Sequence, residues 1–188
     1  MLKNGPKHGQ PFDFNYIKVL IKKGSSDKEQ KEVYVDRDWV SKNNNVPHFS
    51  NVIKGVDRNE GVEITMNCNH EAFKWIIDFV KIKTNGDEEK EDLKQEFKYI
   101  NDRALEKIDN EIENKLEEEL DNVNNDSCLN IMVTAYFLQL RWVYNKVWDY
   151  YFSHCFSEVI NNCKISLSNI NNAIVKDIAH RISDRQLE

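Results

Sequence analysis

The chain has 188 residues and a formal net charge of −6, and hydrophobic residues make up 40% and aromatic residues 11% of it. A chain of this size and composition can bury a full core without disulfides or a structural metal. It has no apolar run near the roughly 20 residues of a membrane-spanning helix, and no dense basic stripe that would follow a nucleic-acid backbone. We therefore expect a protein that binds neither membranes nor nucleic acids directly.

The negative charge is concentrated in one segment. Residues 86–121 contain 15 Asp and Glu and 6 Lys and Arg, a net charge of −9, whereas the rest of the chain carries +3. A carboxylate run of this kind is typical of a solvated helix face. Acid–base catalysis instead needs groups that are held in a cleft with perturbed pKa values.

The four cysteines, Cys68, Cys128, Cys155 and Cys163, include no C-x-x-C pair, so a zinc ribbon or finger is not indicated. No basic-then-apolar signal segment precedes them. We expect reduced thiols in an intracellular protein, mostly packed as small hydrophobic residues, and no metal or other cofactor.

The first elements in chain order are two predicted strands. Residues 1–14 lack periodicity and are expected to form a flexible lead-in. Residues 15–23 alternate as a strand does, and residues 31–40 contain a second strand that ends near Asp36. The G-S-S-D turn signal between them predicts an antiparallel hairpin.

A short helix and a third strand are predicted next. Phe49, Val52 and Ile53 have the spacing of one helix face, and Pro47 is tolerated in a first helical turn. The segment V-E-I-T, residues 62–65, is predicted to be the third strand.

The following segment, residues 70–84, predicts a largely buried helix. Phe73, Ile76, Ile77 and Val80 share one of its faces. Asn69 is a suitable N-cap, because its side-chain oxygen can accept a hydrogen bond from a free amide of the first turn.

Residues 85–126 differ in kind from their neighbours, because they are strongly charged and are bounded by Asn-rich breakers. Apolar residues recur in them at spacings of three or four: Leu93, Phe97, Ile100, Ala104, Ile108, Ile112, Leu116 and Leu120. This pattern predicts a long amphipathic helix. The alternative is a solvated charged insertion with a weak stripe.

The remaining sequence predicts three more helical segments. Residues 127–140 and 141–160 are dense in apolar and aromatic residues. In residues 169–183, isoleucines recur at four-residue intervals, which favours a last amphipathic helix.

This order of elements resembles the BTB/POZ fold. The segments HEAFKWIIDFVKIKT, residues 70–84, and CLNIMVTAYFLQLRWVYNKVWDYYF, residues 128–152, are similar to helices of that family. The chain is most similar to a divergent branch, the BTB domain of the SANT-and-BTB-domain regulator proteins. The residues that carry this resemblance are Arg37-Asp38-Trp39, Phe49, Cys68 and the segment NINNAIVKDIAHRI at residues 169–182.

The resemblance implies an α+β fold, BTB/POZ-like, in which a small, mostly antiparallel sheet packs on a cluster of helices. We expect a single domain over residues 15–188, with a long acidic helical insertion at residues 85–126. The A-H-K segment of ordinary BTB domains is absent, and the insertion has no counterpart in the family.

Cys68 and His70 are the candidates for chemistry. A nucleophilic cysteine needs a base and a lowered thiol pKa, which a helix N-terminus can supply in part. The two residues flank a strand–cap–helix joint and need not face each other, so we interpret them as structural and predict neither a catalytic residue nor a metal ligand.

A partner surface is the more promising functional lead. Six residues around the short helix are predicted to form it: Trp39, Val40, Pro47, Phe49, Val52 and Ile53. In BTB-like domains this region commonly forms a two-fold dimer interface, and such an interface would bury aromatic anchors from both copies. The alternative is that these residues belong to the core of the domain itself.

We therefore expect a non-catalytic protein–protein interaction module that forms homodimers and recruits other proteins. One alternative is a cullin-3 ubiquitin-ligase substrate adaptor, a role that many BTB proteins have. Another is a thiol- or metal-dependent enzyme.

Overall fold

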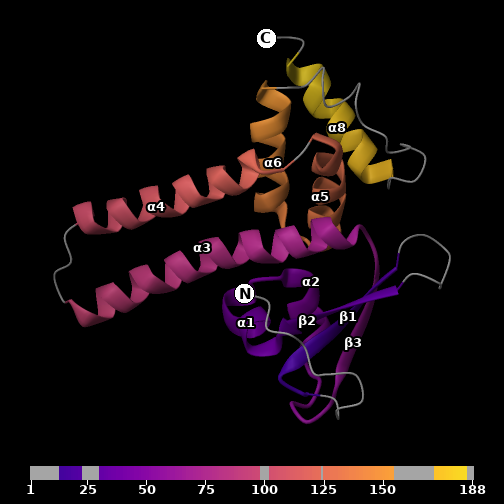
Figure 1. The fold of residues 1–188 in the computed structure, drawn as a ribbon, viewed down its shortest axis with the longest axis vertical. Helices are drawn as coiled ribbons and strands as arrows, with labels where there is room; N and C mark the ends of the chain where they lie inside the picture. Colours follow the sequence, from indigo (N-terminus) through magenta and orange to yellow (C-terminus); the bar gives the residue numbers. More distant parts are fainter. Residues whose placement is uncertain (1–12, 23–29, 98–101, 124, 155–171, 186–188) are drawn as a thin grey trace.

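The computed structural model describes residues 13–22, 30–97, 102–123, 125–154 and 172–185. A small sheet lies at one end of the molecule, and the helices cover it and extend away from it (Figure 1). One hydrophobic cluster includes residues from the first strand through the last helix. Within the described ranges, no helix is both long enough and apolar enough to cross a membrane.

The sheet has three strands, β1 (Tyr16–Lys22), β2 (Gln30–Asp36) and β3 (Val62–Asn67), in the order β2-β1-β3. The predicted antiparallel hairpin of β1 and β2 is confirmed. β3 pairs with β1 in parallel, so the expectation of a mostly antiparallel sheet is wrong and the sheet is mixed. The local pattern that defines a strand does not specify the direction of its partner, which depends on the connection between the two strands.

The two faces of the sheet follow from the alternation of its side chains. Every second residue of β3 is buried, and Val19 of β1 lies opposite Val33 and Ile64 in the apolar layer. On the other face, Lys18 Nζ lies 3.0 Å from Glu32 Oε1 and 3.3 Å from Glu63 Oε2. A lysine at the centre of the sheet thus forms ion pairs with both neighbouring strands.

The connection from β2 to β3 contains α1 (Arg37–Ser41), the short 3-10 helix η1 (Lys42–Asn44) and α2 (Pro47–Ile53). The predicted helix at Pro47 is confirmed, with Pro47 in its first turn. Asp36 is the N-cap of α1, and its carboxylate accepts a hydrogen bond of 2.8 Å from the Trp39 amide.

The helix after β3, α3 (His70–Glu96), is longer than the sequence predicts. Its N-cap is Asn69 as predicted, and the Asn69 side chain accepts a hydrogen bond of 3.0 Å from the Ala72 amide. The predicted break at Asn85 is wrong, because the helix continues through Gly86. Gly86 is buried against Ile112, and this packing offsets the modest cost of glycine in a helix.

The acidic segment is consequently not one long helix. Its first part belongs to α3, and α4 (Asp102–Asp121) turns back along α3 (Figure 1). Ile108, Ile112, Leu116 and Leu120 are buried, so the predicted apolar stripe is confirmed as a packing face over these four residues. Phe97 and Ala104 of the same predicted stripe are exposed. The stripe alone could not reveal that its partner is the preceding helix. We call α4 and the part of α3 from Gly86 onward the acidic arm.

The remaining described helices are α5 (Asn125–Phe137), α6 (Arg141–His154) and α8 (Asn172–Arg185). α5 and α6 form a tight helical hairpin beside α3, and α8 lies next to them (Figure 1). Val143 and Val147 of α6 and Ile174 of α8 are fully buried. Cys155 and Cys163 lie outside the described residues.

Candidate interaction surface

The predicted partner surface is only partly exposed in a single copy of the chain. Val40 and Phe49 have no solvent exposure and Ile53 is 7% exposed, so the expectation that these side chains are free for a partner is wrong. The ring of Phe49 packs against that of Phe73, at 6.0 Å between centroids. Phe49 and Ile53 of the α2 stripe face the core of their own domain, which was the alternative interpretation of the same pattern.

The other three residues keep some exposure. Val52 is 42% exposed, and Trp39 and Pro47 are half-buried. Trp39 is fixed against α3, because its Nε1 donates a hydrogen bond of 3.2 Å to Thr84 Oγ1. Pro47 lines a cavity of about 270 Å³ together with Leu140. The dimer interface in this region remains a prediction, and Val52 is its most accessible apolar side chain.

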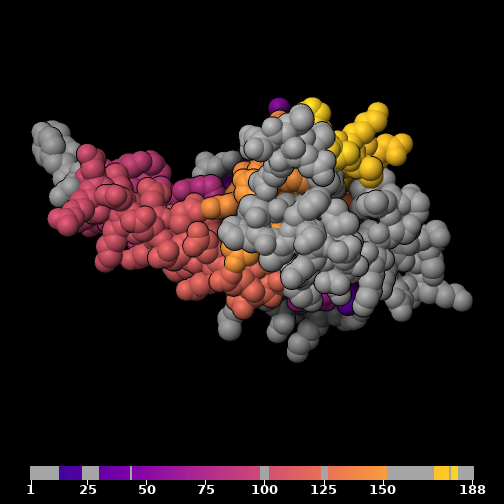
Figure 2. Space-filling view, turned by 90° about the horizontal axis from the view of Figure 1, so that it is seen from above, coloured from indigo at the N-terminus to yellow at the C-terminus, as the bar shows by residue number. Residues whose placement is uncertain are grey.

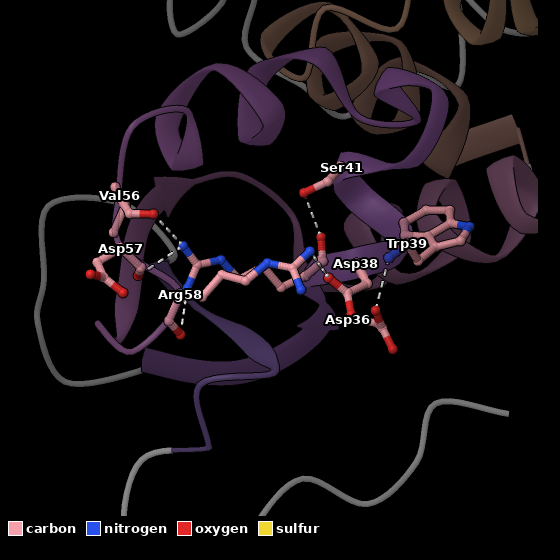
Figure 3. Close-up of polar contacts among 8 residues, drawn as sticks. Asp36, Asp38, Trp39, Ser41, Val56, Asp57 and Arg58 are labelled. Atoms are coloured by element: carbon pink, nitrogen blue, oxygen red, sulfur yellow. Dashed lines mark hydrogen bonds and ion pairs between the residues drawn. The ribbon is translucent and has the colours of Figure 1, made fainter.

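The Arg37-Asp38 segment has a structural role (Figure 3). The Arg37 guanidinium is buried and donates hydrogen bonds to the main-chain carbonyls of Val56 at 3.0 Å, Asp57 at 3.2 Å and Glu60 at 3.1 Å. A fourth, longer contact reaches the carbonyl of Arg58 at 3.4 Å. These bonds hold the loop that leads into β3, since a guanidinium presents several donors in a fixed plane. In contrast to these buried hydrogen bonds, Asp38 forms an exposed ion pair with Arg58 (Figure 3).

The Cys68–His70 joint does not favour nucleophilic chemistry. Burial raises the pKa of the Cys68 thiol to about 12, which leaves it protonated at neutral pH, and the thiolate is the reactive form. His70 Nδ1 lies 2.8 Å from Glu71 Oε1, so its ring is paired with a carboxylate. That hydrogen bond is the main reason that the pKa of Glu71 is lowered. Over the ranges that the structure describes, no group of three or more potential ligands is placed to hold a metal ion.

The turn between α5 and α6 forms a cleft that the sequence did not predict. The cleft has a volume of about 770 Å³. Tyr136 and Phe137, at the end of α5, are 41% and 40% exposed at its edge. Its lining comes from the start of α2, the α5–α6 turn and α8: His48, Tyr136, Phe137, Gln139, Arg141, Tyr144, Ala173, Asp177 and Arg181.

The backbone of the turn is held firmly. Leu138 and Leu140 are buried on either side of Gln139, which has a left-handed φ of 61°. The Leu140 amide donates to the Ala135 carbonyl at 2.9 Å, and the His48 amide donates to the Leu138 carbonyl at 3.4 Å. A left-handed residue other than glycine is strained by roughly 1–2 kcal/mol, so the two buried leucines and these bonds are what stabilise the turn. Tyr136 and Phe137 are therefore presented on a rigid support.

A polar network closes the opposite side of the cleft. Tyr144 Oη donates to Asp177 Oδ2 at 2.7 Å, and Arg181 Nε donates to the same oxygen at 3.0 Å. Burial, and then the hydrogen bond with Asp177, raise the pKa of Tyr144, so this phenol stays protonated as a donor. The Arg181 guanidinium also lies 5.4 Å from the ring centre of Trp148, a cation–π contact that helps to fix α8 on α6.

The cleft has a net positive charge, because its lining contains two arginines, Arg141 and Arg181, and one carboxylate, Asp177. Arg181 neutralises Asp177, whereas Arg141 forms no ion pair with any residue that the structure describes. Arg141 is also the first residue of α6, where the helix dipole is positive. A rim of this kind favours a partner that carries carboxylates.

Sequence reasoning missed this cleft because its walls are far apart in the chain. Asp177 and Arg181 meet the α5–α6 turn only in the folded protein. One signal was available: Tyr136 and Phe137 are adjacent, and adjacent residues of a helix point about 100° apart, so a narrow buried face cannot take both rings.

Comparison of the chain with protein-family models, with curated proteins and with solved structures found no match.

Proposed function

We propose that this chain is a non-catalytic protein–protein interaction module, BTB/POZ-like in its order of elements, that self-associates and recruits protein partners. The observation that carries the proposal is the pair of exposed aromatic residues Tyr136 and Phe137 at the edge of a cleft of about 770 Å³. Aromatic anchors beside a pocket that also offers arginine and hydrogen-bonding groups are typical of residues that dominate binding at protein interfaces.

Two further observations support an interaction module. The cleft is built on a fixed turn, so binding would cost little ordering of the site. The described elements also follow the order that the BTB/POZ resemblance implies, namely a hairpin, a short helix, a third strand and a long helix. No feature of the residues that the structure describes favours the cullin-3 adaptor over other partners, and that role stays a prediction.

The experiment is sedimentation velocity over a wide range of protein concentrations, on the full chain and on the double variant Tyr136→Ser/Phe137→Ser. We expect the sedimentation coefficient of the full chain to rise with concentration and that of the double variant to stay constant. Circular dichroism checks that the variant is folded, which its exposed positions favour. A full chain that remains a monomer at every concentration would refute self-association.

The catalytic alternative is tested separately on the same samples. Metal analysis after extensive dialysis and mapping of alkylated cysteines by mass spectrometry report on a metal site and on a reactive thiol. A stoichiometric metal, or a Cys68 that reacts as fast as a free thiol at neutral pH, would favour an enzyme over an interaction module.

A further inference from the structure

The cleft has a smaller neighbour at the α5–α6 turn. This second cavity has a volume of about 270 Å³, and Gln139 lines both cavities. The consecutive residues His48 and Pro47 of α2 line the cleft and the smaller cavity respectively. The same holds for the consecutive residues Arg141 and Trp142 of α6. The two cavities are therefore adjacent, with Gln139 between them.

Each cavity has an apolar wall. Tyr136 and Phe137 are exposed at the edge of the cleft. In the smaller cavity the wall includes Trp142, whose ring is stacked on that of Phe79 with 5.6 Å between the ring centres. An extended peptide that crosses Gln139 would place one apolar side chain in each cavity.

Gln139 itself suits the backbone of such a peptide. Its side chain is exposed, and its amide group forms no hydrogen bond within the part of the chain that the structure describes. A side-chain amide has two donor hydrogens and an acceptor oxygen. A main-chain carbonyl and a main-chain N–H of a bound peptide are the matching groups.

The charges of the combined lining favour an anionic segment. Arg181 Nε lies 3.0 Å from Asp177 Oδ2 in the cleft. Lys83 Nζ lies 3.2 Å from Asp87 Oδ2 in the smaller cavity. Both of these carboxylates are thus neutralised, whereas Arg141 has no ion-pair partner among the described residues. A carboxylate that enters would meet a guanidinium, whose planar donors match it in geometry.

We propose that the two cavities together bind one extended acidic segment of a partner protein. An apolar side chain of the segment enters each cavity, its backbone pairs with the Gln139 amide, and one of its carboxylates binds Arg141. This inference rests on the proposed function, because it takes the cleft as the recruiting site and names the chemistry of the partner. Burial of the apolar side chains supplies affinity, and the ion pair fixes the orientation of the segment.

The first test selects binders to the full chain from a library of random peptides displayed on phage, at low ionic strength. Peptides that also bind the double variant Tyr136→Ser/Phe137→Ser are removed by counter-selection. We expect the enriched peptides to combine aromatic or leucine residues with Asp or Glu. Enrichment of peptides without acidic residues, or of none at all, would refute the inference.

The second test measures binding of the most enriched peptide, labelled with fluorescein, by fluorescence anisotropy. Arg141→Glu should weaken binding at least about tenfold, because two carboxylates then face each other. Arg141→Lys keeps the charge and should lose less. Replacing the acidic residues of the peptide with lysine should restore binding to Arg141→Glu. Equal affinities of the full chain and Arg141→Glu would show that no carboxylate meets this residue.

Two features guard the second test against damage to the fold. Arg141 is exposed at the start of α6, where an acidic residue is favoured by the helix dipole, so Arg141→Glu should fold normally. The matched control is Lys115→Glu, which makes the same change in net charge at an exposed position of the acidic arm. The arm projects from the body of the molecule (Figures 1 and 2), and this variant should bind the peptide as the full chain does.

The third test uses the left-handed φ of 61° at Gln139. Glycine adopts this conformation without strain, so Gln139→Gly should unfold at the same temperature as the full chain or a higher one. It lacks the side-chain amide and should nevertheless bind the enriched peptide more weakly. Unchanged binding would show that Gln139 does not contact the backbone of the segment.

The outcomes separate this inference from the proposed function. If the double variant loses self-association while no acidic peptide is enriched, the cleft is filled by a second copy, and the proposed function stands without this inference. If the full chain stays a monomer at every concentration but binds acidic peptides through Arg141, self-association fails and the acidic segment stands as the occupant.

Discussion

Gly86 of α3 and Ile112 of α4 lie so close together that a methyl group built at Gly86 would overlap the Ile112 side chain. This contact sets the distance between the two helices of the acidic arm. Gly86 therefore acts through packing, although in the sequence it has the form of a helix breaker.

The contact predicts the effect of Gly86→Ala. Alanine is favoured over glycine in a helix by about 1 kcal/mol, but overpacking a fitted site costs typically about 1–3 kcal/mol. We expect the cost of the overlap to exceed the gain in helix propensity, so the free energy of unfolding measured in urea should fall. In the background Ile112→Ala the same change should instead stabilise the protein. Asn85→Ala, one residue earlier and exposed, is the control and should cause no loss.

The second prediction concerns the effect of Arg37→Ala on the free energy of unfolding. Replacing it with alanine removes the donors of the loop carbonyls at Val56, Asp57 and Glu60 and leaves these acceptors without their partner. Since hydrogen bonds to a charged group contribute about 1.5–3 kcal/mol each, the free energy of unfolding should fall by at least about 3 kcal/mol. Arg58→Ala, which removes only an exposed ion pair with Asp38, should leave the urea midpoint unchanged.

Phe49 and Val52 form a matched pair on α2. Phe49 is fully buried, so Phe49→Ala should cost about 3–5 kcal/mol of stability, and Phe49→Asp should unfold the domain. Val52 is 42% exposed, so Val52→Asp should leave thermal unfolding nearly unchanged. A folded Phe49→Asp variant would contradict the burial of this ring and revive the idea that it is a dimer contact.

The Cys68 thiol predicts how stability depends on alkaline pH. Its pKa is raised from 9.0 to about 12 in the folded chain. Between these two pKa values, the thiol is deprotonated in the unfolded chain and still protonated in the folded chain. The free energy of unfolding therefore falls as the pH rises above 9, by at most about 1.4 kcal/mol per pH unit. Urea unfolding between pH 8 and pH 10.5 should show a steeper loss for the natural chain than for Cys68→Ala. Equal slopes would mean that the thiol titrates normally.

Local signals in the sequence predicted local structure well. Asn69 has a capping side chain before an apolar helix and is the N-cap, and the alternating strands led correctly to the β1–β2 hairpin. These features depend on neighbours within a few residues. The BTB/POZ resemblance, the homodimer and the partners remain predictions.

Predictions failed where distant contacts decide the outcome. The sequence pattern of an apolar stripe, such as the one that contains Phe49, does not tell whether the stripe faces the core or a partner. Only the contact of Phe49 with Phe73 in the folded chain shows that it faces the core. The pairing of Gly86 with Ile112 and the closure of the cleft by Asp177 likewise join residues that are far apart in the chain. The type of each of these residues does not indicate which distant residue it contacts.

The central place of β1 in the sheet has a consequence for folding order. β1 is hydrogen-bonded on both sides, to β2 across a short connection and to β3 across a crossover that includes two α-helices. Contacts between residues close in sequence form sooner than contacts across long loops. We therefore expect the β1–β2 hairpin to form first during synthesis on the ribosome. The parallel pairing of β1 with β3 should form later, after the Arg37 side chain has made its hydrogen bonds to the loop that precedes Val62. A truncation that removes Tyr16 to Lys22 would abolish both ladders at once, whereas loss of β3 would leave the hairpin intact.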